Sequence, residues 1–81
     1  MSEAIRNLPL EIQIGALSPS AREIFYLLRY KKLTPSQIQR KTTYSPRTVR
    51  FALRKLLDLR LVEKIPNLKD LRRISYRTVT P

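Results

Sequence analysis

Apolar residues recur every three or four positions through the middle of the chain, which is the spacing of one face of an α-helix. The first such stripe consists of Ala21, Ile24, Phe25 and Leu28. Ser18 and Pro19 precede it and offer an N-cap and a first-turn proline, so a helix over about 19–30 is predicted. Ser20 and Glu23 also have the spacing of a capping box, which leaves open a start two residues later.

A second, shorter helix is indicated by the same signals. Thr34 stands as a cap, Pro35 follows in the first turn, and Gln37 occupies the third position. This helix is predicted to run to about Lys41, with Ile38 as its main residue facing the core. Residues 42–44 would then form a turn.

A third helix is predicted to begin at Pro46 with Ser45 as its cap, and to run to about Leu59. Its core side follows an i, i+3, i+4, i+7, i+8 pattern and consists of Val49, Ala52, Leu53, Leu56 and Leu57. A short capped helix, a tight turn and a longer capped helix form a helix-turn-helix, whose second helix enters the major groove in DNA-binding proteins.

Beyond Leu59 the apolar period shortens to two, which is typical of β-strands. Residues 61–65 are predicted as one strand, residues 66–70 as a break, and residues 73–79 as the returning strand of a hairpin. The order helix, helix, helix, hairpin predicts an α+β fold. No internal repeat or second domain is visible, so residues 18–81 are expected to form one domain.

Residues 1–17 have the least regular pattern. Four aliphatic residues, Leu8, Leu10, Ile12 and Ile14, alternate with other residues, which favours a short strand or an extended arm. A helix using Ile5, Leu8 and Ile12 is the alternative, and Pro9 counts against it. We expect this arm to end at Gly15. An exposed apolar strand edge invites pairing, so the arm is the expected dimerisation element.

The charge balance points to a polyanionic partner. The chain has 17 Lys and Arg against 6 Asp and Glu, a formal net charge of +11. Such an excess destabilises the folded chain through self-repulsion, and a clustered basic face is the footprint of nucleic-acid binding. A basic chain can instead be merely soluble, or a ribosomal component. We take nucleic acid as the preferred partner, and the helix-turn-helix described above narrows it to double-stranded DNA.

Other function classes are disfavoured by what the composition lacks. The chain has no His and no Cys, which removes the usual general base, the commonest metal ligand and all thiolate chemistry. We therefore expect no enzymatic activity, no catalytic residues, no metal site and no cofactor. No apolar run approaches the roughly 20 residues of a membrane span, and residues 1–10 do not resemble a secretory signal. A cytoplasmic protein without a membrane partner is expected.

The third predicted helix carries its cations on the side opposite its core stripe. That outer side contains Arg47, Arg50, Phe51, Arg54 and Lys55, and no acidic residue lies between Glu23 and Asp58. The simplest alternative is a solvated basic face. In a helix-turn-helix, however, a cationic outer face suits phosphates and guanine edges. Phe51 could contact a thymine methyl or the sugar edge, or it could pack against the first helix or the wing.

The stretch SPRTVRFALRKLLDLRLVEKI resembles the recognition helix and first wing strand of archaeal and bacterial winged helix-turn-helix transcription regulators, the broad group that contains MarR, ArsR and TrmB-type proteins. The stretch KDLRRISYRTV resembles the wing of MarR-like proteins, with an Asp-x-Arg pattern at residues 70–72. The resemblance covers about residues 19–79. It implies a three-helix winged helix-turn-helix with a C-terminal two-stranded β wing.

The resemblance also implies which residues contact DNA. The third helix would read or clamp the major groove, the wing would reach the neighbouring minor groove or backbone, and Asp70 would orient an arginine. With the turn residues added, the predicted DNA-binding set is Thr43, Tyr44, Ser45, Arg47, Thr48, Arg50, Phe51, Arg54, Lys55, Lys69, Arg72 and Arg73.

Two departures from the group change the expectations. Its members usually place Gly after the recognition helix, where a left-handed residue is needed, and this chain has Arg60. Either Arg60 accepts that conformation or the helix ends differently. MarR-like proteins also continue past the wing into a dimerising helix, whereas this sequence stops at Pro81. We therefore expect a homodimer to form through residues 1–17 or the first helix, without an effector pocket between dimerisation helices.

Three functions compete on this sequence. The preferred one is a sequence-specific DNA-binding transcription regulator. A low-specificity architectural DNA-binding protein would share the fold but take its affinity mostly from phosphates, and salt dependence and specificity would separate the two. A winged-helix module that binds RNA or protein would show weak affinity for duplex DNA and a functional apolar patch around Phe51, Tyr26 or Tyr30.

Overall fold

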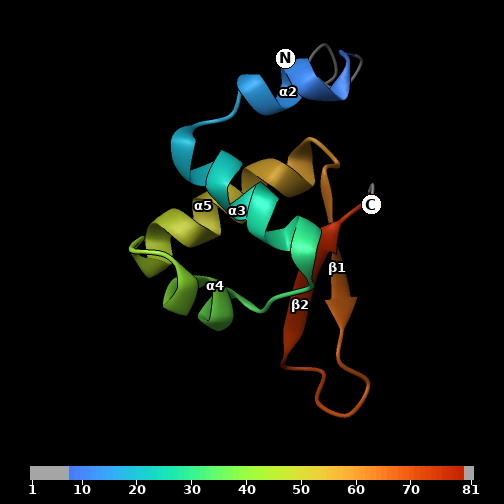
Figure 1. The fold of residues 1–81 in the computed structure, drawn as a ribbon. Helices are drawn as coiled ribbons and strands as arrows, with labels where there is room; N and C mark the ends of the chain where they lie inside the picture. The colour runs from blue at the N-terminus through green and yellow to red at the C-terminus, as the bar shows by residue number, and fades with distance from the viewer. Residues whose placement is uncertain (1–7, 80–81) are drawn as a thin grey trace.

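The computed structural model describes residues 8–79, in which helices form a body and a β-hairpin projects from it (Figure 1). The elements follow in the order α2 (Leu10–Gly15), α3 (Pro19–Tyr30), α4 (Pro35–Lys41), α5 (Pro46–Asp58), β1 (Val62–Pro66) and β2 (Ile74–Thr78). The predicted α+β winged helix-turn-helix is confirmed: α3, α4 and α5 are its three helices, and β1 and β2 are its wing.

Side-chain caps determine where α3 and α4 begin. Ser18 Oγ accepts a hydrogen bond from the Ala21 N–H at 3.3 Å, which favours the earlier of the two predicted starts for α3. At α4, Thr34 Oγ1 accepts from the Gln37 N–H at 3.2 Å, and Gln37 Oε1 accepts from the Thr34 N–H at 2.8 Å. This reciprocal capping box satisfies two of the amide donors that a helix start leaves without intrahelical partners.

The end of α5 turns through a left-handed residue. Arg60 has φ 58°, so the first of the two predicted possibilities is confirmed. Its N–H donates to the Leu57 carbonyl at 2.9 Å, and the Leu61 N–H donates to the Leu56 carbonyl at 2.9 Å. These two bonds are the Schellman pattern. Leu56 and Leu61 are both buried, so the motif brings the chain back over the core as it enters β1.

The core lies between α3, α5 and the base of the hairpin. Among its most enclosed side chains are Phe25, Ile24, Leu28, Leu33, Ile38, Leu56 and Val49. The predicted core stripes of α3 and α5 are buried, except that Leu57 is only half-buried at the edge. Burying a side chain of this size contributes roughly 1.5–3 kcal/mol.

The wing is tied to the helices by its backbone. β1 and β2 pair antiparallel, with Val62 opposite Thr78. Leu33, in the link between α3 and α4, forms a β-bridge with Tyr76 of β2: the Leu33 N–H donates to the Tyr76 carbonyl at 3.0 Å, and the Tyr76 N–H donates to the Leu33 carbonyl at 2.8 Å. The link therefore acts as a one-residue third strand.

The N-terminal prediction of a strand or extended arm is wrong, because residues 10–15 form helix α2. Pro9 does not oppose this helix, since it occupies the N-cap, where its missing N–H is not needed. Its carbonyl accepts from the amides of Ile12 and Gln13 at 3.0 and 3.1 Å. Gly15 is the last residue of α2, as expected. Ile5, which belonged to the alternative helical pattern, lies outside the described residues.

Helix α2 joins the core from one side and is held by α3. Ile14 and Leu17 are buried in the core cluster, whereas Ile12 remains 54% exposed. The Arg22 guanidinium of α3 donates to the carbonyls of Ile14, Gly15 and Leu17 at 3.1–3.3 Å, which supplies partners for carbonyls at the helix end. No helix within residues 8–79 has the length and apolar character that a bilayer crossing requires.

Candidate nucleic-acid interface

The turn between α4 and α5 fixes the start of the second helix. Thr42 Oγ1 donates to the Ile38 carbonyl at 3.0 Å and closes the end of α4. Ser45 Oγ then accepts from the Thr48 N–H at 3.2 Å and caps α5, while the two hydroxyl groups lie 3.0 Å apart. Since Val49 is fully buried one turn into α5, the rotation of the helix about its axis is set by its core contacts.

That rotation leaves a cationic outer face on α5. We call Arg47, Arg50, Arg54 and Lys55 the basic face; all four side chains are exposed, and they lie opposite the buried stripe of the helix. The division of α5 predicted from its periodicity is therefore confirmed. Within residues 8–79 the ion pairs join Asp70 to Arg72 and Glu63 to Arg77, and neither involves a member of the basic face. Its charge is available to an external anion.

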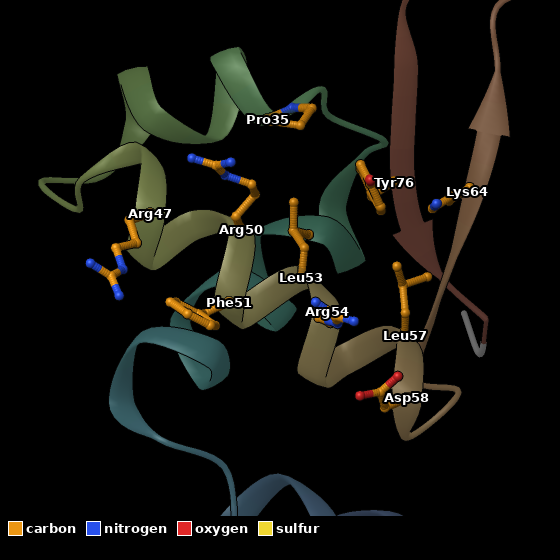
Figure 2. A pocket seen from close by; sticks show the side chains of 10 residues that line it. All are labelled: Pro35, Arg47, Arg50, Phe51, Leu53, Arg54, Leu57, Asp58, Lys64 and Tyr76. Atoms are coloured by element: carbon orange, nitrogen blue, oxygen red, sulfur yellow. The ribbon is translucent and has the colours of Figure 1, made fainter.

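The outer side of α5 and the hairpin border one hollow of about 700 Å³. Figure 2 shows Arg50 rising from α5 toward α4, with Pro35 at the start of α4 and with Tyr76 and Lys64 on the two strands. The hollow is lined by Pro35, Arg47, Arg50, Phe51, Leu53, Arg54, Leu57, Asp58, Lys64 and Tyr76. The second helix of the helix-turn-helix and the wing thus contribute to one surface.

Phe51 is an exposed aromatic residue within this surface. It is 57% exposed, and the Cζ atom of Arg47 lies 5.5 Å from its ring centroid. This is a cation–π contact, which contributes about 0.5–1 kcal/mol at an exposed site. The ring therefore helps to hold the Arg47 guanidinium in place while leaving an apolar edge available.

Tyr44 is directed elsewhere. It is half-buried against the core and lines a second hollow beside α3, together with Glu23, Tyr26 and Tyr30. A hydrogen bond to the Glu23 carboxylate is the main cause that raises the pKa of the Tyr44 phenol, with desolvation and the carboxylate's charge as lesser causes. The structure does not bring Tyr44 together with the basic face. Thr43, its neighbour in the turn, is exposed.

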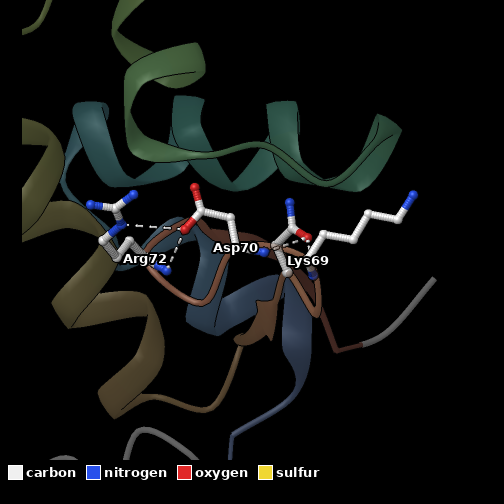
Figure 3. Close-up of polar contacts among 4 residues, drawn as sticks. Lys69, Asp70 and Arg72 are labelled. Atoms are coloured by element: carbon white, nitrogen blue, oxygen red, sulfur yellow. Dashed lines mark hydrogen bonds and ion pairs between the residues drawn. The ribbon is translucent and has the colours of Figure 1, made fainter.

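The predicted wing residues Lys69, Arg72 and Arg73 are exposed on the loop between β1 and β2. Asp70 Oδ1 accepts from the Arg72 N–H at 3.1 Å and lies 3.4 Å from its Nε, so Asp70 does orient an arginine (Figure 3). These three cations lie on the wing loop, whereas the basic face lies on α5. The three wing cations and the four cations of the basic face are all exposed to solvent.

Two residues of this surface were missed by sequence reasoning. Lys64 of β1 and Tyr76 of β2 stand opposite each other in the hairpin and line the hollow beside α5. Their alignment depends on strand register, and the signal that could have found them was a register count across the predicted hairpin. In the described part of the chain, no group of three or more potential metal-ligating side chains gathers.

A sequence profile for the bacterial regulatory proteins of the arsR family matches residues 18–64, which run from the cap of α3 into β1. The chain belongs to this family. No curated protein sequence matches the chain significantly.

Solved structures of regulators share the fold. The adhesin competence repressor AdcR from Streptococcus pyogenes superposes with a TM-score of 0.76 at 18% identity, over 80% of this chain and 47% of AdcR. A cysteine-to-serine mutant of ZitR from Lactococcus lactis gives 0.77 at 26% identity, over 80% of this chain and 44% of ZitR. A cysteine-to-serine mutant of MarR from E. coli, in complex with operator DNA, gives 0.73 at 18% identity, over 98% of this chain and 56% of MarR. This family member thus spans about half the length of these proteins.

Proposed function

We propose that this arsR-family protein is a sequence-specific regulator of transcription that binds double-stranded DNA. Helix α5 lies in the major groove and the basic wing contacts the adjoining minor groove or backbone. The observation that carries the proposal is the basic face: four exposed cations, without ion-pair partners in residues 8–79, on the second helix of a helix-turn-helix. MarR, which shares the fold, has been solved with operator DNA.

The side chains divide into those that read bases and those that hold the backbone. Arg50 and Arg54 stand one turn apart on α5 and suit bidentate contacts to guanine, with Phe51 beside them for a thymine methyl. Arg47, Thr48 and the turn residues Thr43 and Ser45 clamp phosphates near the start of the helix, and Lys55 does so in its last turn. Tyr44 acts through the turn, because it lines the hollow beside Glu23 and lies outside the surface that carries the basic face.

The wing contributes affinity more than sequence preference. Lys69, Arg72 and Arg73 supply phosphate contacts, and Asp70 holds Arg72 in place. If about six phosphates are neutralised in the complex, log K should fall with log salt concentration with a slope of about −5. A slope near zero would exclude this mode of binding and favour a protein partner.

Selection from random duplex DNA at physiological salt tests the proposal, because it returns a motif, unselective binding or no binding. Arg50→Ala should then weaken binding to the selected site by about 1–3 kcal/mol and relax the preference at one base pair. Arg72→Ala is the matched control: it should weaken binding to selected and random DNA alike and reduce the salt slope. Equal losses on both DNAs for Arg50→Ala would make Arg50 a phosphate clamp and the protein an architectural one.

We further propose that the protein acts as a homodimer, through residues 1–17 or through α3. The support is apolar surface on both elements: Ile12 is 54% exposed on α2, and Tyr26 and Tyr30 are 45% and 90% exposed on α3. Deleting residues 1–14 would also remove the buried Ile14, so single substitutions are the cleaner test. Sedimentation should show that Ile12→Glu or Tyr26→Glu dissociates the dimer. A parent chain that is monomeric at high concentration would refute it.

A chromosomal target also implies a cytoplasmic protein. No catalytic role is proposed, since the described cations and exposed aromatics form a binding surface and the chain has neither His nor Cys.

A further inference from the structure

The tip of the wing displays two leucine side chains to solvent. Leu68 is 89% exposed and Leu71 is 70% exposed, although both lie in the loop between Pro66 and Ile74, whose other members are polar or charged. A single exposed leucine on a protein surface needs no explanation. A pair in the loop of the projecting hairpin is different, because it places two exposed apolar side chains at the far end of the wing (Figure 1).

The backbone of the tip is ordered by its polar residues. Asn67 Oδ1 accepts from the amides of Lys69 and Asp70 at 2.9 and 3.3 Å, and the Asn67 N–H donates to the Arg73 carbonyl at 3.1 Å. Asp70 Oδ1 accepts from the Arg72 N–H at 3.1 Å (Figure 3). The Arg73 N–H donates to the Asp70 carbonyl at 2.9 Å. The tip thus consists of two successive side-chain-capped turns.

Each leucine directly follows the residue that caps one of these turns. Leu68 follows Asn67 and Leu71 follows Asp70. Neither leucine side chain is needed for these turns, because turn positions favour Gly, Asn, Asp and Ser. A small polar residue would stabilise these turns as well as leucine or better. We therefore look for a role of the two leucines in binding.

The surroundings of the leucines indicate their partner. Lys69, Arg72 and Arg73 interleave with them along the loop, so the tip combines apolar side chains with cations. Phosphate contacts need only the cations. Proteins that enter the minor groove add leucine or a similar residue, which inserts between base pairs, partly unstacks them and bends the duplex toward the major groove.

We propose that Leu68 and Leu71 form an apolar wedge that enters the minor groove beside the α5 site, partly unstacks a base step and bends the DNA. This rests on the proposed function, in which α5 and the wing meet one duplex; the two elements border one hollow. The wedge adds a preference for certain DNA sequences that does not depend on hydrogen bonds to the bases. Flexible steps such as TA or CA/TG are favoured where the tip enters, since they unstack most easily.

The test compares leucine variants on the selected duplex. The double variant Leu68→Ser/Leu71→Ser should bind on the order of tenfold more weakly. Its DNA bend, measured by end-to-end energy transfer, should decrease, and 2-aminopurine placed at the contacted minor-groove step should lose its unstacking signal. The salt slope should stay unchanged, because the cations remain. The more conservative Leu68→Met/Leu71→Met should retain the bend.

Val79→Ser is the matched control, because Val79 is 51% exposed but lies past β2, outside the tip loop. It should leave the bend as in the parent chain. If the parent selects a motif but the serine variant bends DNA as the parent does, the wedge is refuted and the regulator stands; the leucines then serve a protein contact. If the parent bends DNA through the leucines without selecting a motif, the regulator fails and the wedge stands. Absence of duplex binding overturns both.

Discussion

Replacing Arg60 by glycine should make the protein more stable. Arg60 is the only residue other than glycine in the described chain with a positive φ, and this conformation closes the Schellman motif at the end of α5. In a residue with a Cβ atom, the left-handed conformation costs about 1–2 kcal/mol, because the Cβ approaches the following carbonyl oxygen. Glycine avoids this contact and keeps both backbone hydrogen bonds of the motif.

The gain is reduced by the unfolded state, in which glycine has more conformations to lose on folding. That term is roughly 0.5–1 kcal/mol. The difference leaves a net stabilisation of about 0.5–1 kcal/mol, which for a domain of this size raises Tm by roughly 2–8 °C. Arg60 is exposed, so no packing contact is lost.

Urea and thermal unfolding followed by circular dichroism would measure this effect. Arg60→Ala is the control, because it removes the same positive charge but keeps the Cβ atom and its left-handed strain. The glycine variant should be more stable than the alanine variant by the amount given above. Equal stability of the two variants would refute the reasoning, since charge removal alone would then account for any change.

The remaining predictions concern the core, a cap and a tyrosine. Ile38→Ala should lower the free energy of unfolding by about 2–5 kcal/mol, because its side chain is fully buried between α4 and the core; denaturant unfolding measures it. Thr34→Ala removes the capping box of α4 and should cost about 0.5–2 kcal/mol in the same assay, with Thr43→Ala as an exposed control. The pKa of Tyr44 is raised by Glu23, so this pair's stabilisation is complete below pH 10.0 and is lost as pH rises through the raised value. Glu23→Ala should remove that alkaline loss, and unfolding midpoints on either side of pH 10.0 would show it.

Three helices were predictable because their signals are local. Ser18, Thr34 and Ser45 each cap a helix that begins at a proline, and the structure shows α3, α4 and α5 starting at those prolines. A cap acts within one turn, so it needs no distant contact to be recognised. The outer face of α5 was predictable for the same reason, since a helix period alone separates Val49 from Arg50.

The prediction for the N-terminal segment failed because its short apolar run fits both the strand period of two and the helical period. Leu8, Leu10, Ile12 and Ile14 alternate, but Leu10, Ile14 and Leu17 also have helical spacing, and that second set is the one in contact with the core. Contact with the core beside α3 decides between the two periods, and the residues that form this contact lie elsewhere in the sequence. Proline breaks a helix only in its interior, and Pro9 precedes the first turn of α2.

The sequence predicted which cations of the candidate site are exposed, but not how the surrounding residues are arranged. The exposure of Arg47, Arg50 and Arg54 follows from position on one helix. The turning of Tyr44 toward Glu23 joins the start of α5 to a helix much earlier in the sequence, so it depends on how α3 and α5 pack. Long-range contacts of this kind have no local signature.

The β-bridge between Leu33 and Tyr76 has a consequence for how the protein meets a long ligand. This bridge ties the hairpin to the link between α3 and α4. In the proposed complex, α5 and the wing therefore act as two binding modules joined by a stiff connection. Two such modules gain from high effective concentration only when their separation matches that of their two targets, and they lose the gain when it does not. Duplexes whose helical twist or groove width spaces the targets differently would engage one module at a time. The protein would thus prefer duplexes with one particular spacing between the two contacted grooves, and the Leu33–Tyr76 bridge would fix that spacing.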